Sequence, residues 1–200
     1  MNKAIDFYFD FSSPYGYFGS LHIEKLAAQY DREVNWHAIL LGPIFKLTNS
    51  EPLAGIPLKG AYAIHDMQRT ARLHNILFSI PDAFPISSQA AARAVLWSKQ
   101  SAPAKTADLI HTLYSAYFTE NIDISNADQV LRIAADVGLD RTALAAALNG
   151  ETLKEQLKAE VAAAVEHGVF GSPYVIADGE AFWGFDRFDQ LEAFLKNGKI

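Results

Sequence analysis

Residues 4–16 read AIDFYFDFSSPYG, and this stretch decides the fold. Its first part, residues 4–11, is rich in aromatic side chains and partly alternates apolar with polar residues, which predicts a β-strand. Pro14 then opens a helical pattern that continues to about Tyr30. Residues 33–40 (EVNWHAIL) predict a second strand. The order strand, helix, strand predicts a βαβ unit whose strands run parallel.

The strand pattern returns near the C-terminus. Residues 173–177 (PYVIA) and 180–183 (EAFW) flank Asp178 and Gly179, a dipeptide typical of two-residue hairpin turns. A final helical pattern, with its apolar residues on one face, follows residue 187. The full order is βαβ, a long helical block and then ββα, which predicts an α/β fold.

The section between the two strand regions is predicted to be helical. Its prolines break residues 42–103 into loops and shorter helices. Three later stripes of apolar residues recur at helical spacing, with Asn126 as the predicted N-cap of the second helix and Gly168 at the end of the third. These stripes are Leu109, Ile110, Leu113, Tyr114 and Tyr117; Val130, Leu131, Ala134 and Val137; and Leu153, Leu157, Val161, Ala164 and Val165.

One sheet domain is predicted to form from both ends of the chain. We expect residues 1–41 and 168–200 to build it, together with part of the preceding helix at 151–167. Residues 42–150 are then an α-helical insertion. A chain of 200 residues, half of them hydrophobic, can bury a sizeable core in such an arrangement.

Charge and composition exclude several classes of function. The formal net charge is −6 and no basic patch interrupts it, which argues against nucleic-acid binding. No apolar run approaches the ~20 residues of a membrane span, so we expect no membrane partner. Residues 1–6 (MNKAID) place an acid where a signal peptide has an apolar run, so the expected location is the cytoplasm.

The chain contains no cysteine. This excludes disulfides, thiolate metal sites and a cysteine nucleophile belonging to the protein. The six histidines show no spacing typical of metal ligands, and the sequence therefore implies no metal.

Ser13 and Pro14 lie where the first strand gives way to the first helix. Serine is a favoured helix cap, and proline suits the first helical position because its missing N–H has no partner there. A plain helix cap is one interpretation. The other uses the same geometry, because free amides and the helix dipole at this end favour an anion beside the Ser13 hydroxyl.

Two further places could contact a ligand. Ser172-Pro173 enters a strand after two glycines, so it is a candidate cis peptide whose Ser172 backbone could pair with an extended peptide ligand; an ordinary trans bond is the alternative. Asp186 is expected to be the N-cap of the last helix, and its carboxylate could also hold a ligand ammonium. Trp183 is more often a core residue than a ligand contact.

Residues 7–15, 48–62 and 169–187 together closely resemble the 2-hydroxychromene-2-carboxylate isomerases. That family is similar to kappa-class glutathione transferases and to DsbA, so the resemblance implies a thioredoxin-like fold with a large α-helical insertion. It covers essentially the whole chain in order. One departure is Ser12, which replaces the apolar residue that often precedes the catalytic serine and could compete for the cap role.

The resemblance also implies a site for glutathione. Ser13 matches the catalytic serine, which holds the glutathione sulfur as thiolate. Asn49 and Lys59 match polar positions near the thiol and the glycyl end, and Ser172 would pair its backbone with the cysteinyl part, with Pro173 as the cis-proline. The segment implied around the γ-glutamyl group is Trp183, Gly184, Phe185 and Asp186, with Asp186 on the ammonium.

The implied activity is a glutathione-dependent isomerisation of 2-hydroxychromene-2-carboxylate and trans-o-hydroxybenzylidenepyruvate, or of a related keto-acid from aromatic degradation such as naphthalene catabolism. Disulfide exchange is excluded, since the chain has Ser13-Pro14-Tyr15-Gly16 where DsbA relatives need two cysteines. A kappa-like transferase or peroxidase that consumes glutathione, and a non-catalytic glutathione- or peptide-binding module, are the alternatives. The oligomeric state stays open, with a homodimer among the alternatives.

Overall fold

The computed structural model describes residues 4–200. Its four-stranded sheet has the order β2-β1-β3-β4 and is built from β1 (Ala4–Phe9), β2 (Glu33–Ala38), β3 (Tyr174–Ala177) and β4 (Glu180–Trp183). β1 and β2 are parallel, whereas β3 pairs antiparallel with both β1 and β4. The expectation of a cytoplasmic location rested partly on Met1, Asn2 and Lys3, which lie outside the described residues.

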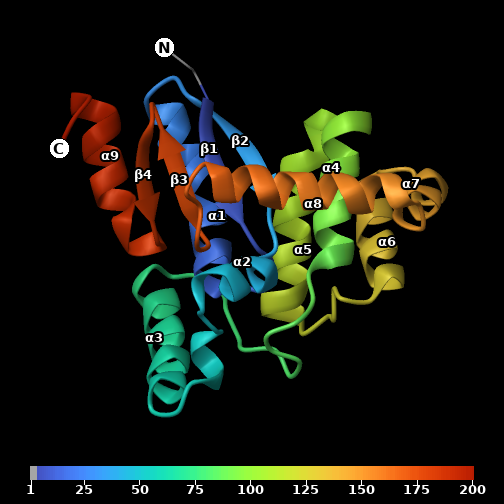
Figure 1. Ribbon diagram of the computed structural model, residues 1–200, viewed down its shortest axis with the longest axis horizontal. Coiled ribbons are helices and arrows are strands. Elements are labelled where there is room, and N and C mark those ends of the chain that lie inside the picture. Colours follow the sequence, from blue (N-terminus) through green and yellow to red (C-terminus); the bar gives the residue numbers. More distant parts are fainter. Residues whose placement is uncertain (1–3) are drawn as a thin grey trace.

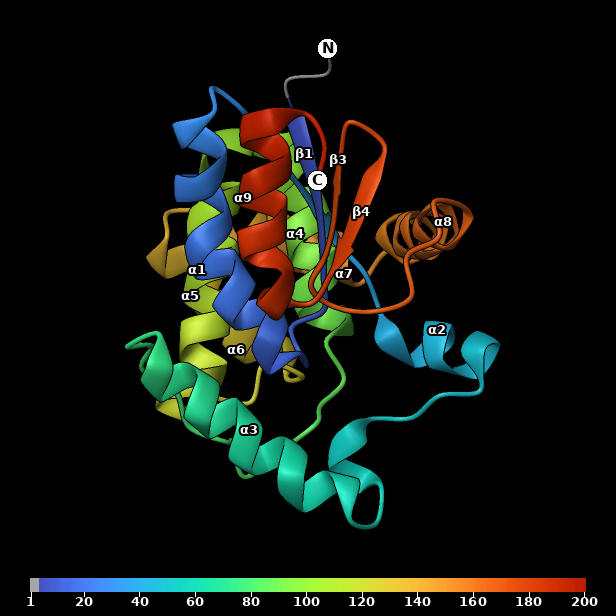
Figure 2. The ribbon, with the colours of Figure 1, turned by 90° about the vertical axis from the view of Figure 1, so that its left-hand side faces the viewer.

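The helices surround this sheet unequally. α1 and α9 cover one face, α8 lies against the opposite side, and α4 to α7 gather beyond β2 (Figure 1, Figure 2). The helices are α1 (Pro14–Gln29), α2 (Leu41–Thr48), α3 (Lys59–Leu73), α4 (Gln89–Ser101), α5 (Thr106–Glu120), α6 (Ala127–Asp136), α7 (Arg141–Leu148), α8 (Glu151–Glu166) and α9 (Phe188–Asn197), with 3₁₀ turns η1 (Leu53–Gly55), η2 (Pro103–Lys105) and η3 (Phe185–Arg187).

The predicted fold is confirmed. The βαβ unit has parallel strands, although each strand ends two residues earlier than expected. The hairpin turn consists of Asp178 (φ 52°) and Gly179 (φ 87°), and the positive φ at both positions matches a type I′ turn. Asn126 caps α6 by accepting the N–H of Asp128, and Gly168 (φ 80°) follows the end of α8. The division into a sheet domain and an insertion remains a prediction.

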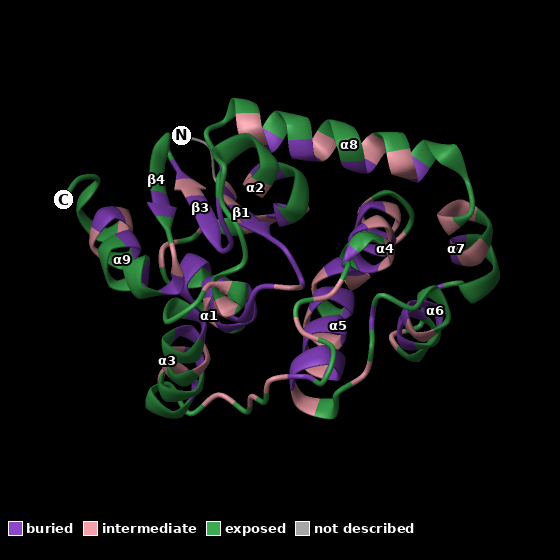
Figure 3. Ribbon diagram, turned by 60° about the horizontal axis from the view of Figure 1, so that its bottom comes forward, coloured by how far each residue is buried: buried purple, intermediate pink, exposed green. Residues whose placement is uncertain are grey.

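One aromatic core joins the sheet to the helices. Phe7 and Phe9 of β1 are completely buried and meet Trp36 of β2 edge to face, with centroids 5.1 and 5.8 Å apart. The ring of Tyr114 in α5 connects this cluster to α1: its centroid lies 5.9 Å from that of Phe9 and 5.6 Å from that of Tyr17. Long helices such as α8 bury one edge against α4 and expose the other (Figure 3). The helical stripes therefore bury their apolar faces as their spacing predicts.

A polar network fixes α8 to the sheet. His37 of β2 has one ring nitrogen 3.1 Å from Asp6 Oδ1 and the other 2.5 Å from Glu160 Oε1 of α8. Asn35 donates to Asp6 at 2.8 Å, and Lys99 of α4 donates to the Trp36 carbonyl at 2.6 Å. A half-buried polar network therefore ties four elements together, namely β1, β2, α4 and α8.

The expectation that Asp186 caps the last helix is wrong. Residues 185–187 form the 3₁₀ turn η3, and α9 begins only at Phe188, with Arg187 in the cap position and no side-chain cap. Asp186 instead forms an ion pair with Arg187 at 3.1 Å. Because the extra turn separates it from α9, its carboxylate is not used by the helix.

None of the helices in residues 4–200 combines the length and the apolar character that crossing a bilayer requires.

Candidate functional site

Ser13 is the N-cap of α1. Its Oγ accepts the N–H of Gly16 at 3.0 Å, and Pro14 occupies the first helical position, so the predicted cap is confirmed. Ser12 does not take the role, because the side chain that accepts a helix N–H is that of Ser13, while the Ser12 N–H bonds Asp10. Ser13 is buried at 7% exposure, so its hydroxyl lies in a partly desolvated place beside the positive end of a helix. An anion placed here would be stabilised by the helix amides and the hydroxyl.

Ser13 also contacts Ser172, which lies 159 positions later in the chain. The Ser13 hydroxyl donates to the Ser172 carbonyl oxygen at 2.8 Å, and the Ser172-Pro173 peptide is cis, as the sequence predicts. The Ser172 hydroxyl in turn accepts the N–H of Asp10 at 3.0 Å. The two predicted site residues therefore lie in direct contact between the start of α1 and the start of β3.

The carboxylate of Asp10 organises the loops beneath this contact. It is only 3% exposed, and three donors from different segments bond it. Oδ1 accepts the Ser12 N–H at 2.9 Å and the Ser88 hydroxyl at 2.7 Å, while Oδ2 accepts the Leu41 N–H at 2.7 Å. A buried carboxylate with several donors is a strong structural tie. The sequence reasoning missed this residue, because its partners come from segments that only folding brings together.

The floor of the site is closely packed around Gly16. A Cβ at this position would lie 2.7 Å from both the Ser172 hydroxyl and the Tyr114 hydroxyl. Tyr114 donates to the Asp10 carbonyl at 3.0 Å, and its complete burial raises its pKa well above the usual value. Gly16 is therefore required here by the close approach of two side chains.

Tyr15 ties α1 to α3. Its hydroxyl donates to Asp66 Oδ2 at 2.5 Å, and Asp66 also forms an ion pair with Arg69. Burial first, and then the hydrogen bond to Asp66, raise the pKa of Tyr15, with smaller contributions from Asp186 and Tyr62. None of these α3 residues was expected from the sequence. The only signal there is the i, i+4, i+7 spacing of positions 62, 66 and 69, which places them on one face of a helix.

The segment after β4 lies beside the Ser172 turn. The Gly184 N–H bonds the Pro173 carbonyl at 3.0 Å. Trp183 is 55% exposed, so the core position that tryptophan more often takes does not apply here; its indole covers Gly171, where any Cβ would clash with it. Gly184 has φ 103°, a conformation that favours glycine, and Phe185 is buried at 6% exposure.

Asn49 and Lys59 lie apart from these residues. Asn49 ends α2 in the left-handed conformation (φ 51°), and Lys59 is the first residue of α3; both side chains are exposed. In the part of the chain that the structure describes, no hydrogen bond or ion pair joins either of them to Ser13 or Ser172. The structure thus brings together Ser13, Ser172, Pro173 and the 183–186 segment, and leaves Asn49 and Lys59 on a separate exposed arm.

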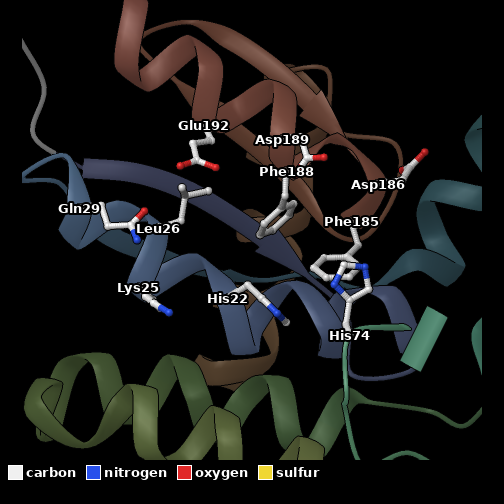
Figure 4. A pocket seen from close by; sticks show the side chains of 10 residues that line it. All are labelled: His22, Lys25, Leu26, Gln29, His74, Phe185, Asp186, Phe188, Asp189 and Glu192. Atoms are coloured by element: carbon white, nitrogen blue, oxygen red, sulfur yellow. The ribbon is translucent and has the colours of Figure 1, made fainter. Parts of the chain in front are cut away.

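A cavity of about 350 Å³ lies between α1 and the start of α9 and does not include Ser13. Figure 4 shows Phe185 and His74 close together at one end, and Asp186 pointing away from the cavity. The side chains that line it are His22, Lys25, Leu26, Gln29, His74, Phe185, Asp186, Phe188, Asp189 and Glu192. Within residues 4–200 no three histidine or acidic side chains converge as metal ligands.

Comparison with known proteins agrees with this geometry. The model of the DSBA-like thioredoxin domain matches residues 4–196. The 2-hydroxychromene-2-carboxylate isomerase of Pseudomonas putida is 29% identical over 96% of this chain and 93% of its own length. Rat glutathione S-transferase kappa 1 is 23% identical over 96% of this chain and 91% of its own.

A solved structure of a 2-hydroxychromene-2-carboxylate isomerase superposes with a TM-score of 0.87, at 28% identity over 96% of this chain and 94% of its own. The resemblance that the three motifs indicate is therefore confirmed along the whole chain. With a domain match that spans nearly every residue, the chain belongs to the family of DSBA-like thioredoxin-domain proteins.

Proposed function

We propose that this protein is a glutathione-dependent isomerase that interconverts 2-hydroxychromene-2-carboxylate and trans-o-hydroxybenzylidenepyruvate, or a closely related conjugated keto-acid. The observation that carries the proposal is the contact between Ser13 and Ser172 at the N-terminus of α1, in a chain without any cysteine. Its similarity to isomerases over nearly the full length supports the same reaction class.

The residues present fit glutathione. The Ser172 carbonyl accepts one hydrogen bond and has a second lone pair for a ligand N–H. The start of α1 offers backbone amides to an anion. The Asp186 carboxylate is exposed, and its ion pair with Arg187 uses only Oδ2, which leaves Oδ1 to accept from an ammonium. Ser172 and Pro173 would then hold the cysteinyl part, Asp186 with the 183–185 segment the γ-glutamyl end, and Asn49 and Lys59 the glycyl end.

When bound, glutathione supplies a thiolate that adds reversibly to the conjugated system, so that the former double bond can rotate. Ser13 stabilises that anion with its hydroxyl and with the positive end of α1. Its single proton is engaged by the Ser172 carbonyl in the ligand-free protein. A ligand N–H that displaces this bond on the Ser172 carbonyl would free the Ser13 proton for the anion.

The burial of Ser13 strengthens its stabilisation of an anion. The side chain is nearly buried, and the ring centroids of Phe11 and Tyr114 lie 4.8 Å apart, with the two ring planes tilted by 53°. Hydrogen bonds to a charged group are worth more in such a medium than in water. Catalysis then depends on donors that are already in place before the substrate arrives.

A transferase or peroxidase that consumes glutathione is the second candidate, because kappa-class transferases are also similar along the whole chain. One experiment separates the two. Turnover of a chromene-carboxylate and of a benzylidenepyruvate is followed by absorbance with and without glutathione, and free thiol is titrated in parallel. Isomerisation requires glutathione and leaves the thiol concentration constant. Stoichiometric loss of thiol would support the transferase, and turnover without glutathione would refute both.

We propose a cytoplasmic location and a small aromatic keto-acid as partner, and we leave a homodimer as one alternative for the assembly. Size-exclusion chromatography with light scattering decides the last point.

A further inference from the structure

α3 passes directly beneath the start of α1 (Figure 1, Figure 2). The connection is the hydrogen bond from Tyr15 to Asp66 at 2.5 Å, and Tyr15 is only two residues beyond Ser13. Tyr62, Asp66 and Arg69 follow one another at i, i+4 and i+7, so they share the face of α3 that meets Tyr15. This face therefore borders the surroundings of Ser13.

The guanidinium of Arg69 is held in position on this face. Nη2 donates to the Tyr62 hydroxyl at 3.1 Å and to Asp66, and the guanidinium carbon lies 5.6 Å from the centre of the Tyr62 ring. These bonds involve only one of its three nitrogens, and the side chain is 49% exposed. The remaining donors of a rigid, permanently charged fork are therefore free for a planar anion.

Tyr62 adds a flat apolar surface to this cation. Its side chain is 63% exposed, although an aromatic ring of this size is ordinarily more buried. Aromatic ring and guanidinium together suit a ligand that is itself a planar, conjugated carboxylate. An ammonium would be repelled by the charge of Arg69, and an aliphatic acid would leave the ring without a planar partner.

Other cations near the site are engaged elsewhere. Arg187 pairs with Asp186 at 3.1 Å, and Lys59 is the residue proposed for the glycyl end of glutathione. Asp66 holds Arg69 through Oδ1 only, because its other oxygen, Oδ2, accepts the Tyr15 hydroxyl. Of these three cations, Arg69 is the one that lies against an exposed aromatic ring, and its bonds to Tyr62 and Asp66 use only Nη2.

We propose that Arg69 binds the carboxylate of the aromatic keto-acid, with the conjugated part of the acid packed against Tyr62 and with Asp66 as the residue that positions the guanidinium. The identity of the acid rests on the proposed function. The binding residue itself does not, because a non-reacting aromatic carboxylate tests it directly.

The test measures binding by isothermal titration calorimetry at saturating glutathione. The probe is chromone-2-carboxylate, a stable analogue of the ring system, and the matched neutral probe is chromone. Arg69→Met should weaken chromone-2-carboxylate about tenfold to a hundredfold, the effect of losing a hydrogen bond to a charged group, and leave chromone unchanged. Arg69→Lys should recover part of the loss, since it restores the charge without the fork.

Arg72→Met, on the same helix, is the control and should bind both probes like the wild type. Asp66→Asn should weaken the carboxylate probe less than Arg69→Met does, because the guanidinium remains but loses its anchor. Equal affinities of wild type and Arg69→Met for chromone-2-carboxylate would overturn the proposal, as would a wild type that does not bind it. So would a loss confined to glutathione affinity in Arg69→Met, which would place a glutathione carboxylate on Arg69.

Failure of the proposed function gives a different result. Absence of isomerase turnover in the wild type would refute that function, while selective loss of the carboxylate probe in Arg69→Met would still establish the binding residue. Where turnover is present, Arg69→Met should raise KM for the keto-acid and change kcat less.

Discussion

The hydroxyl of Ser13 donates to the carbonyl oxygen of Ser172, 2.8 Å away, while the Ser13 Oγ itself accepts the N–H of Gly16 at 3.0 Å. One side chain thus caps α1 and also joins its first turn to the loop that enters β3. Both interactions exist without any ligand. The anion-binding end of the helix is therefore preorganised by contacts that also stabilise the fold.

Replacing Ser13 separates these two roles. Ser13→Ala removes the cap, which should lower the free energy of unfolding by about 0.5–2 kcal/mol. If the hydroxyl also stabilises the glutathione thiolate, turnover per folded molecule should fall about tenfold to a hundredfold, and the pH–rate profile should move to higher pH because the thiol pKa rises. Turnover against pH, with the folded fraction checked by circular dichroism, measures both.

The matched control for this change is Ser12→Ala. Ser12 contributes its backbone N–H to Asp10 and takes no part in the cap, so the variant should keep most of the activity. Wild-type rates and an unchanged pH profile in Ser13→Ala would reduce Ser13 to a helix cap.

Glutathione should stabilise the folded protein. A ligand that binds only the native state raises the melting temperature by mass action, by an amount that grows with the ratio of its concentration to Kd. We expect a concentration-dependent rise over the millimolar range, measured by differential scanning fluorimetry. S-methylglutathione, which lacks the thiol proton, controls for binding of the peptide frame alone. A melting temperature that does not change up to several millimolar glutathione speaks against the cofactor.

Gly16 should tolerate no side chain. Gly16→Ala places a methyl group 2.7 Å from the hydroxyls of Ser172 and Tyr114, both buried, and such overpacking costs about 1–3 kcal/mol. Gly42→Ala is the matched control, because a Cβ there meets nothing within 4 Å and alanine is the better helix former. Urea unfolding compares the two. Equal stabilities would show that the floor of the site can relax around the methyl group.

Glu160 should make stability depend on pH in the acid range. Burial alone raises the pKa of Glu160, but the hydrogen bond and charge of His37, helped by Lys99, lower it further than burial raises it. A carboxyl group with a lowered pKa stabilises the fold above its unfolded pKa, about 4.3, and loses this contribution as the pH falls through the folded value. Asp6 and Tyr8 also face this cluster; Tyr8 stays protonated, since burial and then Asp6 and Glu160 raise its pKa to about 12.

The variant Glu160→Gln measures that contribution. It should lower the free energy of unfolding by about 1.5–3 kcal/mol at pH 7, and by less at pH 3, which is below the unfolded pKa, where the contribution of a lowered folded pKa is being lost. Glu155→Gln, on the exposed side of the same helix, removes a surface ion pair with Lys158 and should change stability by about 0–1 kcal/mol. A Glu160→Gln effect of equal size at both pH values would contradict the assigned role of the charge.

The local features of this protein follow from its sequence, because neighbouring residues alone decide them. The aromatic strand before Ser13, the serine and proline that start α1, and the Asp178-Gly179 turn each depend on steric or hydrogen-bonding preferences within a few residues. The absence of cysteine also excluded disulfide exchange without any structure. The roles of Asn49, Lys59 and Asp186 came from family resemblance and remain to be tested.

Tertiary structure alone decided the rest, since it depends on which distant segments meet. Asp10 is bonded by donors at positions 12, 41 and 88, and no local pattern marks such partners. The outward position of Trp183 depends on the place that Gly171 leaves for its indole, and the η3 turn that separates Asp186 from α9 depends on packing. The Tyr15–Asp66 bond likewise exists only because α3 packs beneath α1. Local preferences fix the elements, whereas side-chain partners across elements are fixed by packing of the whole core.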